Sequence, residues 1–171
     1  IAIHPSQRLV HVTNHQTGET FTQPYAKLCI ATGARPIYPP IPGIELPGIF
    51  TLRALSDAQR IHAYMQKNTI KSAVVVGAGY IGLEMVEAMR ERDVETYLVE
   101  KQPQVMPNFD ADMVASITPH VQEKQVKLHL GTEVTAITQH GKRLAIHTGK
   151  AGTVEADIVI LSIGVRPNSE L

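Results

Sequence analysis

Three glycines near the middle of the chain have the spacing of a phosphate-binding loop. Gly77, Gly79 and Gly82 form a G-x-G-x-x-G pattern between the apolar run SAVVV and a segment with helical spacing. In such a loop the first glycine permits a tight turn, the second lets a pyrophosphate approach the backbone, and the third lets the helix pack closely. Free N–H groups at the start of the helix, including that of Ile81, hold the phosphate charge. The pattern predicts a dinucleotide site, and its alternative is a strand-to-helix turn without a ligand.

Glu100 ends the next predicted strand and lies 18 positions after Gly82. A carboxylate at this place accepts hydrogen bonds from the adenosine ribose hydroxyls of NAD and repels the additional phosphate of NADP. The pattern therefore favours NAD(H), although the neighbouring cation Lys101 is able to accommodate that phosphate in part. The alternative is that Glu100 only ends a strand in solvent.

The elements that must position these residues alternate as in an α/β fold. Short, continuous apolar runs are typical of parallel strands that are buried on both faces. The predicted strands of this kind are 72–77, 94–100, 126–130 and 156–164. The predicted helices are 56–67, 80–93 and 110–125. Three short segments at 132–139, 143–149 and 152–156 predict an antiparallel meander. The expected fold is a Rossmann-like domain with a parallel sheet, helices and a β-meander.

Helix signals refine these boundaries. Ser56 or Asp57 is expected to cap the first helix, and Asp110 the third. Pro119 is placed to kink or divide that third helix. In the second helix, Ile81, Met85 and Met89 recur at helical spacing, and the two methionines are predicted to be core residues.

The N-terminal part has strand patterns and then a proline-rich stretch. Segments 8–14, 21–25 and 27–33 predict a small β-meander that ends in a buried strand. Cys29 lies within the last segment, so we expect it to be buried and not to carry redox chemistry. Residues 34–50 contain five prolines and are interpreted as a connector, because proline removes donors and fixes φ.

Composition narrows the classes of protein that remain. Sixteen basic residues balance sixteen acidic ones without a run of either sign, so neither nucleic acid nor a membrane is an expected partner. No apolar run approaches the roughly 18 residues that span a bilayer. A single cysteine is typical of a reducing compartment, and a cytoplasmic location is expected. His11 and His15 lie in a strand and turn context that does not converge them, so no metal site is predicted.

Three motifs together resemble a known family. CIATGARP (29–36), VVVGAGYIGLE (74–84) and LSIGVRPN (161–168), in this order, are similar to the flavin-dependent pyridine nucleotide-disulfide oxidoreductases. The resemblance is to the branch that contains NADH oxidase, NADH peroxidase and coenzyme A-disulfide or persulfide reductase. It implies the end of an FAD-domain meander in 1–35, a connector and helix in 36–70, an NAD(H)-binding domain in 71–160, and a return to the FAD domain in 161–171.

The resemblance also implies roles for single residues. Tyr80 matches a gate over the flavin ring, and Glu84 matches a residue that supports the nicotinamide. The alternative is a half-buried aromatic and a favourable charge near the positive end of a helix. Gly164 is expected to approach NADH. Thr32 and Gly33 are expected to touch FAD only in the full-length parent enzyme.

Members of this family also carry an FAD fingerprint, a redox cysteine and a dimerisation domain, which the 171 residues lack. The chain is therefore expected to be a central NADH-binding piece of a homodimeric flavoprotein, without a catalytic residue of its own. In the parent, NADH would reduce FAD, and a cysteine-based centre would act on a disulfide, persulfide, peroxide or oxygen. Two alternatives remain, a flavin-free NAD-dependent dehydrogenase and a non-catalytic NADH sensor.

Overall fold

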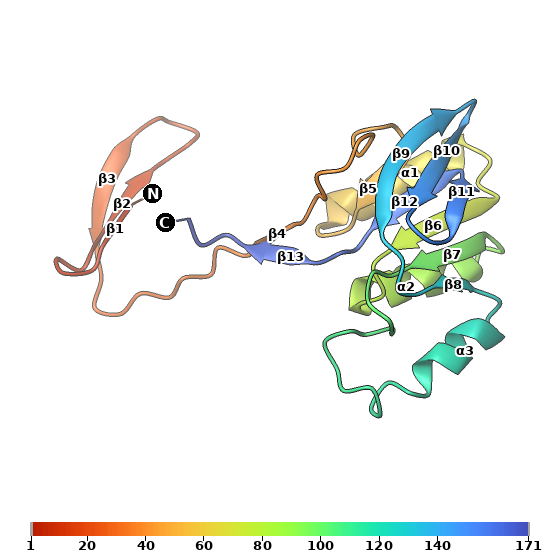
Figure 1. The fold of residues 1–171 in the computed structure, drawn as a ribbon. Helices are drawn as coiled ribbons and strands as arrows, with labels where there is room; N and C mark the ends of the chain where they lie inside the picture. Colours follow the sequence, from red (N-terminus) through yellow and green to blue (C-terminus); the bar gives the residue numbers. More distant parts are fainter. Residues whose placement is uncertain (1, 171) are drawn as a thin grey trace. The chain divides into compact units, whose positions relative to one another are not determined.

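The computed structural model describes residues 2–170 and divides the chain into two units (Figure 1). The larger unit is Pro36–Val165, and the smaller unit combines residues up to Arg35 with those from Arg166 onward. Among residues 2–170, no helix is long and apolar enough to cross a membrane.

A five-stranded parallel sheet forms the centre of the larger unit. Its order is β5-β12-β6-β7-β8, and every neighbouring pair runs parallel. The strands are β5 (Ile49–Thr51), β12 (Ile158–Leu161), β6 (Ser72–Val76), β7 (Glu95–Val99) and β8 (Lys127–His129). All residues of β6 and β12 are buried, which agrees with central parallel strands that are covered on both faces.

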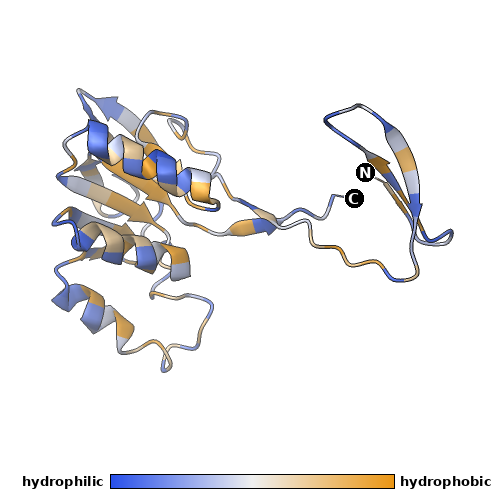
Figure 2. Cartoon of the chain, turned by 180° about the vertical axis from the view of Figure 1, so that it is seen from behind, coloured by the Kyte–Doolittle hydropathy of each residue, from blue (hydrophilic) through white to orange (hydrophobic). Residues whose placement is uncertain are grey.

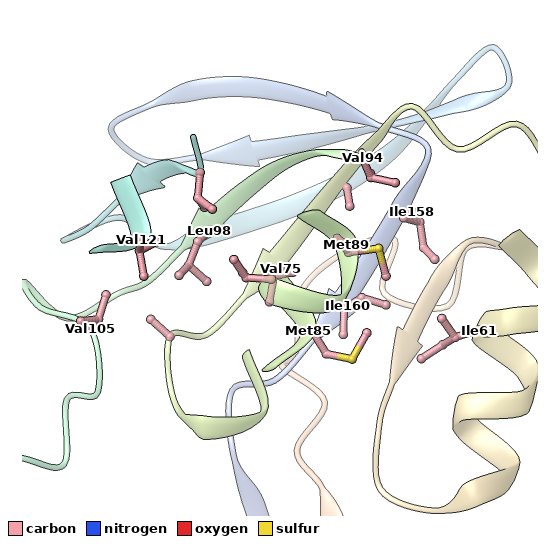
Figure 3. Close-up of a cluster of buried hydrophobic side chains, with 14 residues drawn as sticks. Ile61, Val75, Met85, Met89, Val94, Leu98, Val105, Val121, Ile158 and Ile160 are labelled. Carbon is pink, nitrogen blue, oxygen red and sulfur yellow. The ribbon is translucent and has the colours of Figure 1, made fainter. Parts of the chain in front are cut away.

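Three helices cover one face of this sheet. They are α1 (Leu55–Lys67), α2 (Tyr80–Arg90) and α3 (Ile117–Glu123). Side chains from the helices pack with alternate strand residues in one apolar cluster, which Figure 3 shows. Its members include Ile61, Met85, Met89, Val75, Leu98 and Ile160. Met85 and Met89 are thus core residues as predicted, whereas Ile81 is 37% exposed and stays outside the core.

An antiparallel meander covers the other face. It consists of β9 (Val134–His140), β10 (Arg143–Thr148) and β11 (Gly152–Ala156), in the order β11-β10-β9. Val74 and Val76 point to this side because successive strand residues alternate between faces, and they pack with Ile137 and Ile146 of the meander. Figure 2 shows hydrophobic residues concentrated in the strands of the larger unit. The predicted parallel sheet with an antiparallel meander is therefore confirmed.

Asp157 joins the meander to the sheet. Its Oδ2 accepts hydrogen bonds from the backbone N–H groups of Lys71 and Ser72 and from the Ser72 hydroxyl, and its Oδ1 accepts one from Arg143. Partial burial raises the pKa of Asp157, but these donors outweigh it, so the pKa lies below its ordinary value. The ionised carboxylate is the form that stabilises this junction.

The smaller unit contains the antiparallel sheet β1-β2-β3. Its strands are β1 (Ala2–His4), β2 (Leu9–Thr13) and β3 (Thr20–Pro24). Two further short strands, β4 (Ala34–Pro36) and β13 (Val165–Pro167), pair with each other where the chain passes between the units. Arg35 forms an ion pair with Glu170 at 2.5 Å, and this contact lowers the pKa of Glu170 to about 2.

The prediction of a buried strand at 27–33 was wrong. This stretch is not a strand, and Cys29 is exposed rather than buried. An apolar strand needs hydrogen-bonding neighbours on at least one side, and residues 2–170 pair no strand with this stretch. The connector prediction also missed β5, which is short and joins the edge of the parallel sheet, where proline-rich surroundings are tolerated.

Three helix boundaries differ from those predicted. The first helix is capped at Ala54, and Asp57 in its first turn reaches back to accept hydrogen bonds from the Arg53 and Ala54 N–H groups. The second helix ends at Arg90, shortly before Asp93 adopts a left-handed φ of 57°. The third begins at Ile117, not at Asp110.

Pro119 explains the late start of the third helix. It stands in the first turn of α3, where the missing N–H removes no intrahelical bond. Residues 111–116 form turns instead of helix. The proline therefore fits the beginning of a short helix and does not kink a long one.

Candidate functional site

A cavity of about 700 Å³ opens at the carboxyl ends of the parallel strands. We call it the strand-end cavity. The last residues of β6, β7 and β12 form its floor. The glycine loop after β6 and residues 132–134, at the start of β9, form parts of its wall. The crevice beyond the carboxyl ends of the strands is where open α/β sheets bind ligands. The position of the cavity therefore marks it as the candidate site.

A smaller cavity of about 400 Å³ adjoins it. We call it the loop cavity. It is lined by Tyr80, Ile81, Met106 and Phe109, among others. The two cavities share a set of wall residues, namely Gly79, Pro107, Asn108, Ser162 and Gly164. An extended ligand that fills the first cavity can thus continue into the second.

The three glycines differ in what surrounds them. Gly77 has a left-handed φ of 101°, and a Cβ there would lie 2.5 Å from the carbonyl oxygen of Ser162. A Cβ on Gly82 would lie 1.9 Å from the carbonyl oxygen of Gly77. A Cβ on Gly79, by contrast, would meet no atom within 4 Å. The fold itself therefore requires Gly77 and Gly82, whereas Gly79 leaves its space open at the wall of both cavities.

The N-terminus of α2 adjoins this open space. Gly79 is the N-cap, and the first intrahelical hydrogen bond runs from the Leu83 N–H to the Gly79 carbonyl. The N–H groups of Tyr80, Ile81 and Gly82 come before that bond, and the first turn holds no acidic side chain. Such an end carries partial positive charge and suits an anion.

Glu100 is 8% exposed and lines the strand-end cavity. Its Oε2 accepts the Ala78 N–H at 2.8 Å, and its Oε1 accepts the Gln102 N–H at 2.7 Å. The alternative that Glu100 only ends a strand in solvent is therefore wrong. A carboxylate oxygen has room for more than one hydrogen bond, and each oxygen of Glu100 accepts one here, so acceptor capacity remains for a ligand.

The loop that follows β7 completes both cavities. The Met106 N–H donates to the Ala78 carbonyl at 2.8 Å, which ties this loop to the glycine loop. The Gln104 side chain donates to the Phe109 carbonyl at 2.8 Å. Pro107 and Asn108 are held between these two bonds and face both cavities. Sequence reasoning missed this loop, although its place directly after the carboxyl end of a parallel strand was a usable signal.

Sequence reasoning also missed Ser162. Its hydroxyl lies 2.9 Å from the carbonyl oxygens of both Val76 and Gly77. These contacts join the ends of β12 and β6 beneath the glycine loop. Gly164, two residues further on, lines both cavities, and its approach to NADH stays a prediction.

Tyr80 and Glu84 share one face of α2, but only Tyr80 also lines the loop cavity. Tyr80 is 65% exposed and meets the Phe109 ring edge-on, with 5.8 Å between ring centroids. This exposure is more than a half-buried packing residue would have. Glu84 is exposed and lines a groove between α2 and α3 that Tyr80 also borders. Glu84 is not among the residues that line the strand-end cavity or the loop cavity.

The remaining predicted residues fall into two groups. Lys101 lies at the strand-end cavity, where its Nζ is 2.8 Å from the Glu133 Oε1. Thr32 and Gly33 belong to the smaller unit and bond with Asn168, which donates to both of their carbonyls. They line neither cavity.

Comparison with known proteins adds independent findings. The family described as pyridine nucleotide-disulphide oxidoreductase matches residues 1–171. An NADH oxidase of Methanocaldococcus jannaschii is 38% identical over 156 residues, which are 90% of this chain and 34% of that protein. A coenzyme A disulfide reductase of Staphylococcus aureus is 33% identical over 171 residues, 99% of this chain and 37% of that protein. The chain thus spans about a third of the length of these curated relatives.

Several solved structures are also similar to this chain over nearly all of its length. A reduced Bacillus anthracis CoADR-RHD matches with a TM-score of 0.86 and 38% identity, over 100% of this chain and 30% of that one. The water-forming NADH oxidase of Lactobacillus brevis bound to NADH has a TM-score of 0.84 and 34% identity, and the match covers 98% of this chain and 37% of that one. An engineered mutant of that oxidase bound to NADPH has a TM-score of 0.84 and 32% identity, and the match covers 100% of this chain and 38% of that one.

Proposed function

The chain belongs to the pyridine nucleotide-disulphide oxidoreductase family, and we propose that it supplies the NADH-binding part of an NADH-dependent FAD oxidoreductase. The observation that carries this proposal is the strand-end cavity, in which the open position at Gly79, the N-terminus of α2 and the buried Glu100 converge. A dinucleotide site needs three parts: open space for the pyrophosphate, a positive helix end, and a carboxylate that binds the ribose.

The two adjoining cavities suggest how NADH would lie. The pyrophosphate would rest against Gly79 and the first N–H groups of α2, and the adenosine ribose would donate hydrogen bonds to Glu100. The nicotinamide would extend into the loop cavity toward Tyr80, Ile81 and the main chain at Gly164. In this arrangement the protein positions the nicotinamide, and the chemistry belongs to the cofactor.

The preference for NADH over NADPH rests on Glu100, and the engineered relative supports it. Its substituted glycine is followed by a substituted aspartate after 18 positions, an alanine after 19, a methionine after 20 and a proline after 25. The same offsets from Gly82 fall on Glu100, Lys101, Gln102 and Pro107. In the mutant that binds NADPH, the aspartate is alanine and the neighbouring alanine is arginine. This chain has an acidic residue, Glu100, at the first of these positions, and at the second it has the cation Lys101, where the mutant has arginine.

In a full-length enzyme of this kind FAD would supply the acceptor for the reducing equivalents of NADH, and a disulfide, persulfide, peroxide or oxygen would be the final acceptor. Thr32 and Gly33, the residues that resemblance assigns to FAD, line neither cavity. The 171 residues are expected to bind NADH without oxidising it.

Calorimetric titration of the chain with NADH and NADPH tests the proposal. We expect NADH to bind with a Kd between about 1 μM and 1 mM, the usual range for enzyme substrates, and NADPH to bind at least about tenfold more weakly. Absorbance at the nicotinamide band should stay constant when NADH and the chain are mixed alone. The absence of NADH binding, or equal affinities for the two nucleotides, would contradict the proposal.

A further inference from the structure

A charged pair stands beside Glu100 at the strand-end cavity, and one of its members, Glu133, has no part in the proposal above. Lys101 Nζ and Glu133 Oε1 are 2.8 Å apart, and both residues line the cavity. The two side chains are 66% and 58% exposed. An exposed pair of this kind adds little to folding stability. Its place at the cavity is what makes it informative.

The backbone fixes this pair next to the carboxylate that would bind the ribose. The Thr132 N–H donates to the Glu100 carbonyl at 2.9 Å, and the Gly131 N–H donates to the Gln102 carbonyl at 2.8 Å. The Glu133 carbonyl accepts the Gly149 N–H at 3.1 Å, which anchors the segment from its other side. The segment that carries Glu133 is thus bonded directly to the segment that carries Glu100 and Lys101.

We propose that Glu133 is a second determinant of the preference for NADH over NADPH. This inference rests on the proposed function, because it concerns the ribose end of the same nucleotide. Glu133 acts in two ways. Its negative charge repels a phosphate on the ribose, and its ion pair with Lys101 occupies the one cation among residues 100–102 that would attract that phosphate.

The size of the effect follows from the charges. A ribose phosphate carries a charge close to −2 at neutral pH, so loss of one negative charge about 6 Å away in water changes its affinity by roughly tenfold, and salt reduces this. Lys101, released from its ion pair with Glu133, would in addition attract the phosphate. Discrimination against the phosphate should therefore fall by about three- to tenfold when Glu133 loses its charge.

ADP-ribose and 2′-phospho-ADP-ribose are suitable probes, because they differ only in the phosphate and contain no nicotinamide. Calorimetric titrations of both into the chain give the ratio of their Kd values. We expect Glu133→Gln to lower the ratio of the phosphorylated to the plain ligand about three- to tenfold relative to the original chain. Glu133→Asp, which keeps the charge, should keep most of the discrimination. Glu91→Gln makes the same change at the C-terminal end of α2, away from the cavity, and should not alter the ratio of Kd values.

The double variant Lys101→Gln with Glu133→Gln separates the two effects. If release of Lys101 contributes, the double variant loses part of the gain that Glu133→Gln produced. A double variant that keeps the whole gain would overturn the part of the inference that concerns Lys101. A ratio that is unchanged in Glu133→Gln, while the original chain still binds ADP-ribose, would overturn the inference and leave the proposed function intact. A chain that fails to bind ADP-ribose at all would overturn both.

Discussion

The Glu100 carboxylate accepts the backbone N–H of Ala78 at 2.8 Å and so joins the end of β7 to the glycine loop. The same carboxylate accepts the Gln102 N–H through its other oxygen. Glu100 therefore shapes the loop against which a phosphate would rest, and it also presents acceptors to the cavity. One residue links the stability of the site to its specificity.

Glu100→Gln should impair both properties. The amide has only one acceptor oxygen for two backbone donors and no charge, so one of the N–H groups of Ala78 and Gln102 loses its partner. We expect the free energy of unfolding to fall by about 1–3 kcal/mol in denaturant titrations, and discrimination between NADH and NADPH to shrink at least about fivefold. Glu91→Gln, at an exposed glutamate, serves as the control. Unchanged stability would contradict the bridging role of the carboxylate.

Gly79→Ala and Gly77→Ala should have different effects. A Cβ on Gly79 meets no protein atom, so Gly79→Ala should keep its melting temperature and bind NADH at least about tenfold more weakly, because the methyl group enters the space for phosphate. Gly77 has a left-handed φ and would press a Cβ against the Ser162 carbonyl. Gly77→Ala should therefore lower the free energy of unfolding by more than about 2 kcal/mol. Thermal melts and titrations of both variants test this contrast, and a Gly79→Ala variant that binds normally would refute the phosphate position.

The junction at Asp157 should make stability depend on pH. The folded-state pKa of Asp157 lies below its ordinary value, so its contribution is fully present above the unfolded pKa of about 4 and is lost as the pH falls through the folded value. Asp157→Asn should cost about 1–2 kcal/mol at pH 7, since the charge-assisted bonds with Arg143 and Ser72 weaken. Denaturation between pH 7 and pH 2 should show the two proteins converging at low pH. A constant difference across this range would be inconsistent with the role of the carboxylate.

Met89 should be among the costly positions of the core. It is 2% exposed and lies within the helix-side cluster of Figure 3. Met89→Ala removes buried atoms and leaves a cavity, so the free energy of unfolding should fall by about 2–4 kcal/mol. Leu55→Ala is the matched control, because Leu55 is 75% exposed at the start of α1 and its truncation should cost less than about 0.5 kcal/mol. Similar losses for both variants would argue against this core.

The sequence predicted the parts of the fold that depend on local pattern. Apolar runs such as 72–77 mark buried parallel strands, and Gly77 and Gly82 mark a turn that tolerates no side chain. What it missed depends on contacts between distant segments. The bonds of Ser162 to the end of β6, and of the Met106 N–H to Ala78, leave no periodic signal. Cys29 was misplaced for a related reason, because an apolar run predicts a strand whether or not a partner strand is present.

If NADH binds in the strand-end cavity, amide chemical shifts measured by two-dimensional NMR during an NADH titration should change at the residues that line it. We predict that the shifts gather at the glycine loop, at residues 100–102 and at 162–164, and that Gly79 and Tyr80 are among the amides most affected. The same resonances should move less with NADPH at equal concentration. Shifts confined to the groove between α2 and α3, or no shifts at millimolar NADH, would show that NADH does not bind in the strand-end cavity.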